Sequence, residues 1–257
     1  MDKVFNLLVP HIGEKILENI ATDELIKWFM VSETWRILAE NVLLKRWKGE
    51  IFEASRCGKS EIVKLLLERT DIKLNATDDC GRTALMRACY NGHKDVVQLL
   101  LNSPVRIELD TKTPDGRNAF MLACRKGHKD IVQLLLNFSD KTIELNAKDA
   151  DGRNAFMLAC RVGHKGIVQL LLNYPDQNIN LNARDNRGRT AFLLACYHGH
   201  KNVVQLLLNC SDRNINLNTR DNGGCTGFQL AWNQRHKDIV MLLVDNLYDR
   251  FHNYISL

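Results

Sequence analysis

One stretch of 22 residues recurs along this chain at almost constant spacing. Two of its copies, GRNAFMLACRKGHKDIVQLLLN and GRNAFMLACRVGHKGIVQLLLN, differ at only two positions. The five copies open at glycines that are 35, 36, 36 and 36 residues apart, namely Gly81, Gly116, Gly152, Gly188 and Gly224. A period of this length is typical of a solenoid, in which each copy is one small unit that packs on its neighbours.

Each copy has the pattern of two short helices joined by a tight turn. In the second copy, Phe120–Cys124 is apolar on nearly every side, as expected for an inner helix between neighbouring copies. Gly127 can adopt the positive φ that ends this helix. A second helix over Asp130–Asn137 presents one apolar face, formed by Ile131, Leu134 and Leu135. Asp149–Gly152 then supplies the polar turn of the next hairpin. Because no single copy can bury these apolar faces alone, the copies must stack.

The copies resemble the ankyrin repeat, since Gly-Arg-Thr-Ala-Phe stands where that family has Gly-x-Thr-Pro-Leu. The resemblance implies an all-α solenoid of helix pairs with short β-hairpin turns over residues 49–247. A degenerate copy, IFEASRCGKSEIVKLLLE, precedes the five full ones. Residues 248–257 are expected to form a C-terminal capping tail.

A Cys four residues before a His is either half of a metal site or a pair of structural residues. Zinc needs four converging ligands, and a thiol inside an apolar helix has no partner pair there. We therefore expect no metal and no cofactor, and the ankyrin resemblance implies structural hydrogen bonds for the histidines. Buried cysteines suit reduced thiols in the cytoplasm or nucleus. The two ladders are Cys89, Cys124, Cys160 and Cys196, and His93, His128, His164, His200 and His236.

The segment 1–48 contains no copy of the repeat and reads as three short helices. Val31-Ser32 through Trp35, Leu38 and Ala39 resembles the Val-Cys-x-x-Trp-x-x-Leu-Ala run of an F-box. This resemblance implies that the segment binds a Skp-type adaptor on a cullin scaffold. The alternative is that these helices only cap the apolar end of the solenoid. The expected adaptor-binding residues form an exposed apolar patch: Leu8, Pro10, Ile16, Leu17, Leu25 and Val31.

Charge and hydropathy exclude several classes of protein. The net charge of +5 lies in the repeats, where acidic residues are interspersed and aromatic residues do not alternate with basic ones, so we expect no nucleic-acid partner. No apolar run is long enough to cross a bilayer, so we expect no membrane partner. No nucleophile, base and orienting group recur as a unit, which argues against an enzyme.

The variable positions of the repeats are the candidate substrate-binding residues. Tyr90, Arg125, Arg161 and Tyr197 occupy one position in successive copies, so they should form a row with two arginines at its centre. Neighbouring guanidinium groups favour a partner with an acidic segment. The same surface should include Asn233 at this position and Asp115, Asp151 and Arg187 at the hairpin tips. The alternative is neutral drift at exposed positions.

Two functions remain open. The first is the substrate-recognition subunit of a cullin-type ubiquitin ligase, a monomer within that complex whose concave ankyrin face binds a protein substrate. The second is an ankyrin scaffold or inhibitor whose N-terminal helices only cap the solenoid.

Overall fold

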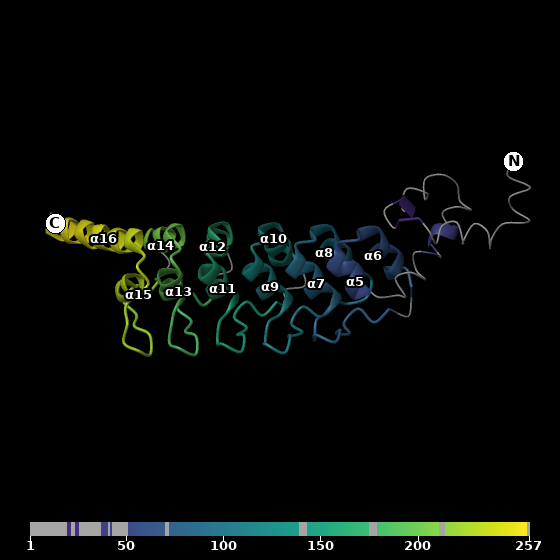
Figure 1. The fold of residues 1–257 in the computed structure, drawn as a ribbon, viewed down its shortest axis with the longest axis horizontal. Helices are drawn as coiled ribbons and strands as arrows, with labels where there is room; N and C mark the ends of the chain where they lie inside the picture. Colours follow the sequence, from purple (N-terminus) through teal and green to yellow (C-terminus); the bar gives the residue numbers. More distant parts are fainter. Residues whose placement is uncertain are drawn as a thin grey trace, which may run out of the picture. The chain divides into compact units, whose positions relative to one another are not determined.

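The computed structural model describes residues 20–21, 24–25, 37–40, 42, 51–69, 72–138, 143–174, 179–210 and 214–255, with side chains as far as residue 248. The chain forms two compact units, residues 1–107 and 108–257. In the second unit, α9, α11, α13 and α15 form one layer and α10, α12, α14 and α16 the other (Figure 1).

The described helices follow one another in pairs, as the repeat predicts. The first pair, from the degenerate copy, is α5 (Ile51–Cys57) and α6 (Ser60–Leu67). The next pairs are α7 (Ala84–Asn91) and α8 (Lys94–Leu101), α9 (Ala119–Lys126) and α10 (Lys129–Asn137), and α11 (Ala155–Val162) and α12 (Lys165–Leu172). The last pairs are α13 (Ala191–His198) and α14 (Lys201–Leu208), and α15 (Gly227–Asn233) and α16 (Lys237–Ile255).

Capping residues mark both ends of the inner helices α7, α9, α11 and α13. The side chain of Asn154 accepts a hydrogen bond from the backbone N–H of Met157 at 3.0 Å, and Thr83 and Thr190 cap their helices in the same way. Such caps satisfy N–H groups that have no partner within the helix. Each of these helices ends at a glycine with positive φ, such as Gly127 at +89°. The predicted role of Gly127 is therefore confirmed.

The core of each pair lies around its inner helix. Phe156 and Cys160 of α11 are 1% and 0% exposed, because helices from both neighbouring repeats enclose them. The predicted apolar face of α10 is only partly right. Ile131 and Leu135 are buried, but Leu134 is half-buried. Val132 and Leu136 are buried as well, so the buried face of α10 consists of two adjacent pairs of residues, 131–132 and 135–136.

The connections between pairs are tight turns. The N–H of Asp149 donates to the carbonyl of Arg153 at 2.9 Å, and the N–H of Gly152 donates to the carbonyl of Asp149 at 2.8 Å. Equivalent bonds close the turns at Asp78, Thr113, Asp185 and Asp221. Each turn has the hydrogen bond of a hairpin, but no strand occurs within the described residues.

The two ends of the chain differ from expectation where the structure describes them. Leu8, Pro10, Ile16, Leu17 and Val31 lie outside the described residues. Leu25 is 0% exposed, which differs from the exposed position predicted for it. The tail expected over 248–257 is, as far as Ile255, a continuation of α16, because no proline or glycine interrupts that helix. Among the described helices, none has both the length and the apolar character needed to cross a membrane.

Candidate protein-binding surface

The repeated histidines join each repeat to the one before it. The Nε2 atoms of His164, His200 and His236 lie 3.0, 2.9 and 3.1 Å from the backbone carbonyl oxygens of Arg125, Arg161 and Tyr197. In the first unit, His93 makes the same bond to the carbonyl of Arg56 at 2.9 Å. The histidine ladder is therefore structural, as the resemblance implies.

The repeated cysteines are core residues. Cys89, Cys124, Cys160 and Cys196 are each 0% exposed. Burial raises the pKa of the Cys89, Cys160 and Cys196 thiols far above the ordinary value, which keeps them protonated and unreactive. Within the described residues, no three His, Cys, Asp or Glu side chains come together as a metal site would require.

The arginines that follow the turn glycines are held by carboxylates in the second unit. Arg117 Nη2 lies 3.2 Å from Asp149 Oδ2, in the next repeat, and Arg117 also pairs with Asp115. Arg153 Nη1 lies 2.7 Å from Asp151 Oδ2, and Arg153 Nε lies 3.7 Å from Asp185 Oδ2. Ion pairs between consecutive turns thus fix the positions of these side chains.

Asp185 accepts hydrogen bonds from both the backbone and an arginine side chain. Its Oδ2 accepts a hydrogen bond from Arg189 Nε at 3.3 Å, and its Oδ1 accepts the backbone N–H groups of Arg187 and Arg189 at 2.9 and 2.8 Å. The carboxyl side chain is only 1% exposed. A buried carboxylate with this many donors stabilises both the turn and the guanidinium groups around it.

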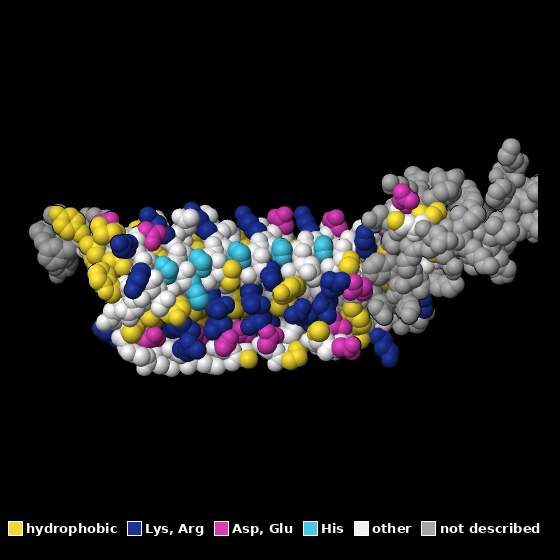
Figure 2. Space-filling model, viewed as in Figure 1, with side chains coloured by type: hydrophobic (Ala, Val, Ile, Leu, Met, Phe, Trp, Pro, Cys, Tyr) yellow, Lys and Arg dark blue, Asp and Glu magenta, His cyan; other side chains and the backbone are white. Residues whose placement is uncertain are grey.

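Arg125 and Arg161 lie on α9 and α11, and unlike the arginines that follow the turn glycines in the second unit they have no carboxylate partner among the described residues. Both are half-buried, and no carboxylate among the described residues forms an ion pair with either side chain. Burial, and then the charges of Arg153 and Arg125, lower the pKa of Arg161 from its ordinary value. Over the second unit, Figure 2 shows Lys and Arg gathered with Asp and Glu between a row of histidines and the hairpin loops.

His198 of α13 borders the same cluster of positive charge. Its pKa is lowered to about 4 by burial and by the nearby charge of Arg161, with smaller effects of His200, Arg189 and Arg153. Its ring stands edge-on to Tyr197, with the ring centroids 5.0 Å apart. The imidazole is therefore neutral at physiological pH and offers both a hydrogen-bond donor and an acceptor next to Arg161.

The two tyrosines of the predicted row are each covered by an arginine of their own repeat. The guanidinium carbon of Arg189 lies 5.3 Å from the ring centroid of Tyr197 in the second unit. In the first unit, that of Arg82 lies 4.7 Å from the ring centroid of Tyr90. These cation–π contacts hold the tyrosine rings in place and leave them half-buried.

The structure brings only part of the predicted site together. Arg125, Arg161 and Tyr197 come from inner helices that pack side by side, α9, α11 and α13. Tyr90 belongs to the first unit. Asp115 and Asp151 are exposed, but their carboxylates are engaged with Arg117 and Arg153. Arg187 is exposed at a hairpin turn, and Asn233 is exposed on α15.

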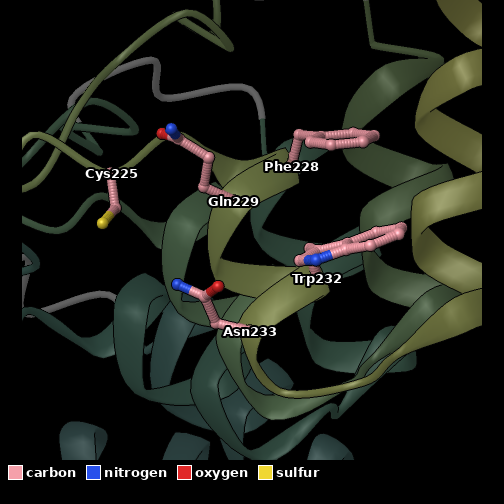
Figure 3. A pocket seen from close by; sticks show the side chains of 5 residues that line it. All are labelled: Cys225, Phe228, Gln229, Trp232 and Asn233. Atoms are coloured by element: carbon pink, nitrogen blue, oxygen red, sulfur yellow. The ribbon is translucent and has the colours of Figure 1, made fainter.

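Two functional candidates were not foreseen: Phe228 and Trp232. The rings of Phe228 and Trp232 lie nearly parallel (Figure 3). The angle between their planes is 13°, and their centroids are 6.3 Å apart. Together with Cys225, Gln229 and Asn233 they line a hollow of about 310 Å³. Alignment of the copies already contained the signal, since Trp232 stands where the preceding copies have cysteine.

Comparison with known proteins agrees with the repeat architecture. A family model of three ankyrin repeats matches four overlapping stretches, residues 51–148, 105–185, 139–221 and 177–253. The probable E3 ubiquitin-protein ligase XBOS33 of Oryza sativa subsp. japonica is 41% identical over 89 residues, and the E3 ubiquitin-protein ligase XBAT33 of Arabidopsis thaliana is 38% identical over 89 residues. Each match covers 35% of this chain and 17% of the ligase.

A third relative is not named as a ubiquitin ligase. Osteoclast-stimulating factor 1 of Monopterus albus is 44% identical over 52 residues, which cover 20% of this chain and 24% of that protein. The matches thus span less than a quarter of each of these three relatives. The family model, by contrast, covers every residue from 51 to 253. With its helix pairs, glycine-ended inner helices and histidine ladder, this protein-binding chain belongs to the ankyrin-repeat family.

Proposed function

We propose that this chain is a partner-recognition subunit in ubiquitin ligation, and that its second unit captures a protein with an acidic segment. The observation that supports this most is the state of Arg125 and Arg161. Their neighbours Arg117, Arg153 and Arg189 are paired with carboxylates, whereas no carboxylate of the described residues pairs with these two.

An acidic partner fits this arrangement for electrostatic reasons. Two half-buried guanidinium groups on adjacent helices repel each other, and a bound carboxylate would relieve that repulsion. Each guanidinium can donate two parallel hydrogen bonds to a carboxylate. The paired arginines do not compete for the ligand, because Asp151 and Asp185 already hold them. Neutral His198 adds a hydrogen-bonding group for an uncharged part of the partner.

The link to ubiquitin ligation has two supports. The two plant relatives are named as E3 ubiquitin-protein ligases, and the segment 1–48 resembles an F-box. On this proposal a Skp-type adaptor and a cullin scaffold bind the N-terminal segment, the repeats hold the substrate, and the chain itself catalyses no reaction. We expect the complex to act in the cytoplasm or nucleus.

The second candidate function is an ankyrin scaffold or inhibitor without an adaptor. It is favoured by the limited match to the plant ligases, which covers only 17% of their length. Binding of a purified Skp-type adaptor distinguishes the two functions. Replacing Leu8 and Pro10 with alanine should abolish adaptor pull-down without lowering the melting temperature. If the wild-type chain binds no adaptor, the scaffold function is the correct one.

Substrate capture is tested separately with a fluorescent glutamate-rich peptide and anisotropy. Charge reversal of both sites, Arg125→Glu with Arg161→Glu, should weaken binding at least about 30-fold, since each hydrogen bond to a charged group contributes about 1.5–3 kcal/mol. Raising the salt concentration from about 50 to 300 mM should weaken wild-type binding as well. Dissolved ions screen the attraction between the two arginines and the acidic peptide, with a screening length of about 10 Å at 0.1 M. Lys165→Glu with Lys201→Glu, at exposed lysines that begin the outer helices α12 and α14, is the matched control. Equal effects of the two double substitutions would rule out this site.

A further inference from the structure

The last repeat ends with a broad apolar face. Phe228 and Trp232 of α15 are stacked on each other. Trp232 and Met241 line one hollow of about 710 Å³, and Phe228 and Leu247 line another of about 360 Å³, so the two helices contribute to one continuous surface. The exposed fractions are 37% for Phe228, 65% for Trp232, 60% for Met241, 44% for Val244, 64% for Leu247 and 63% for Tyr248. Figure 2 shows hydrophobic side chains gathered over α15 and α16.

The preceding repeat shows what normally happens to these positions. Phe192 and Cys196 are the counterparts of Phe228 and Trp232, and they are 3% and 0% exposed. The following repeat covers them so closely that a Cβ placed on Gly227 would lie 2.7 Å from Phe192 Cε1 and 3.1 Å from Cys196 Sγ. The apolar end face is therefore the surface on which each internal repeat binds the next one.

Two substitutions prevent another ankyrin repeat from packing here in the same way. Trp232 replaces the small cysteine against which the next inner helix would pack. Arg235 replaces the glycine on which the next histidine ring would rest, and its φ of 62° shows that the backbone shape is retained. At the equivalent Gly199, a Cβ would lie 2.6 Å from His236 Cε1. A partner of this face must therefore approach differently from a repeat.

We propose that a second copy of this chain covers the face, so that two chains pair through α15 and α16. With side chains of these sizes, the exposed fractions amount to about 700 Å² per chain, close to the ~800 Å² per partner of a standard protein interface. Two stacked aromatic rings at the centre provide the residue types that contribute most to association. This pairing replaces the expectation of a monomer drawn from the sequence.

The charges on α16 suit a two-fold symmetric pair. Lys237 lies four residues before Met241, and Asp245 lies four residues after it; all three are exposed. If two α16 helices cross antiparallel at Met241, Lys237 of each copy comes level with Asp245 of the other. The same two residues then attract each other twice, as a two-fold interface requires. Met241 and Trp232 lie at the centre and lose their contact with water.

The first experiment measures the oligomeric state of the full chain by sedimentation equilibrium from about 1 to 100 μM, concentrations at which a dimer with a micromolar or lower dissociation constant is populated. We expect a dimer for the wild-type protein. Trp232→Ser with Met241→Gln, which makes the face similar to that of an internal repeat, should raise the dissociation constant at least about 30-fold, as loss of central anchors does. If the wild-type protein is a monomer over this whole concentration range, the proposal is wrong, and something other than a second copy covers the face.

The second experiment tests the geometry by exchanging charges. Lys237→Asp alone and Asp245→Lys alone should each weaken the dimer, whereas the double variant should restore it, because the attraction is only reversed in direction. Lys165→Asp is the matched control, since Lys165 is exposed and begins α12 as Lys237 begins α16. It should leave the dimer unchanged. The pairing is contradicted if the substitutions at Trp232 and Met241 leave the dissociation constant of the dimer unchanged. It is also contradicted if the double charge variant forms a weaker dimer than either single variant.

Discussion

Replacing Gly163 with alanine should cost more stability than replacing Gly224 with alanine, although both glycines have positive φ. The φ values are +89° and +77°. A residue with a Cβ in this region costs about 1–2 kcal/mol, so both variants share that loss. Any difference between them must come from the surroundings of the added methyl group.

The surroundings differ because a histidine ring of the next repeat rests on Gly163. A Cβ there would lie 2.5 Å from His200 Nδ1 and 2.8 Å from Cε1, whereas no atom lies within 4 Å of a Cβ on Gly224. The imidazole must move, and its bond of 2.9 Å to the carbonyl of Arg161 breaks. Losing that bond costs about 1 kcal/mol, with further loss of packing. We expect about 2–4 kcal/mol for Gly163→Ala and about 1–2 kcal/mol for Gly224→Ala.

Urea unfolding followed by far-ultraviolet circular dichroism measures both losses. A third variant, His200→Ala, removes the ring that the methyl group meets, so combining it with Gly163→Ala should cost about 1 kcal/mol less than the sum of the two. Equal losses for the two glycine variants would refute the reasoning. So would full additivity of Gly163→Ala and His200→Ala.

Three further outcomes are expected. The pKa of His198 should be near 4 in an NMR titration, and removing the charge of Arg161 by Arg161→Gln should raise it toward 6.5. Because the pKa of His198 is lower in the folded than in the unfolded protein, neutral His198 contributes stability above about pH 6.5, and this contribution is lost as the pH falls through 4. Gly166 is the second residue of α12, a position at which α8, α10 and α16 carry Asp. Only Lys129 Cδ, at 3.5 Å, is near its added Cβ, so Gly166→Asp should raise the unfolding free energy by about 1 kcal/mol in urea. A thiol reagent should modify exposed Cys80 in the native protein but reach buried Cys160 only after unfolding.

The sequence by itself determined the elements that depend on neighbouring residues. The period of the glycines predicts the helix pairs, and Gly127 and the turn at Asp149–Gly152 lie where the pattern places them. These features follow from backbone conformation and from hydrogen bonds that span only a few residues. The buried cysteine ladder also follows, because an inner helix that is apolar all round needs cover on both sides.

Only the tertiary structure decided which charges are available. Arg153 and Arg161 look alike in the sequence, but Asp151 and Asp185 hold the first and no carboxylate of the described residues pairs with the second. Likewise, Trp232 takes the place of a core cysteine in the repeat and is nevertheless 65% exposed. The contact of Arg153 with Asp185 and the exposure of Trp232 both depend on atoms about one repeat away along the chain, and a local pattern carries no information about how those atoms are placed.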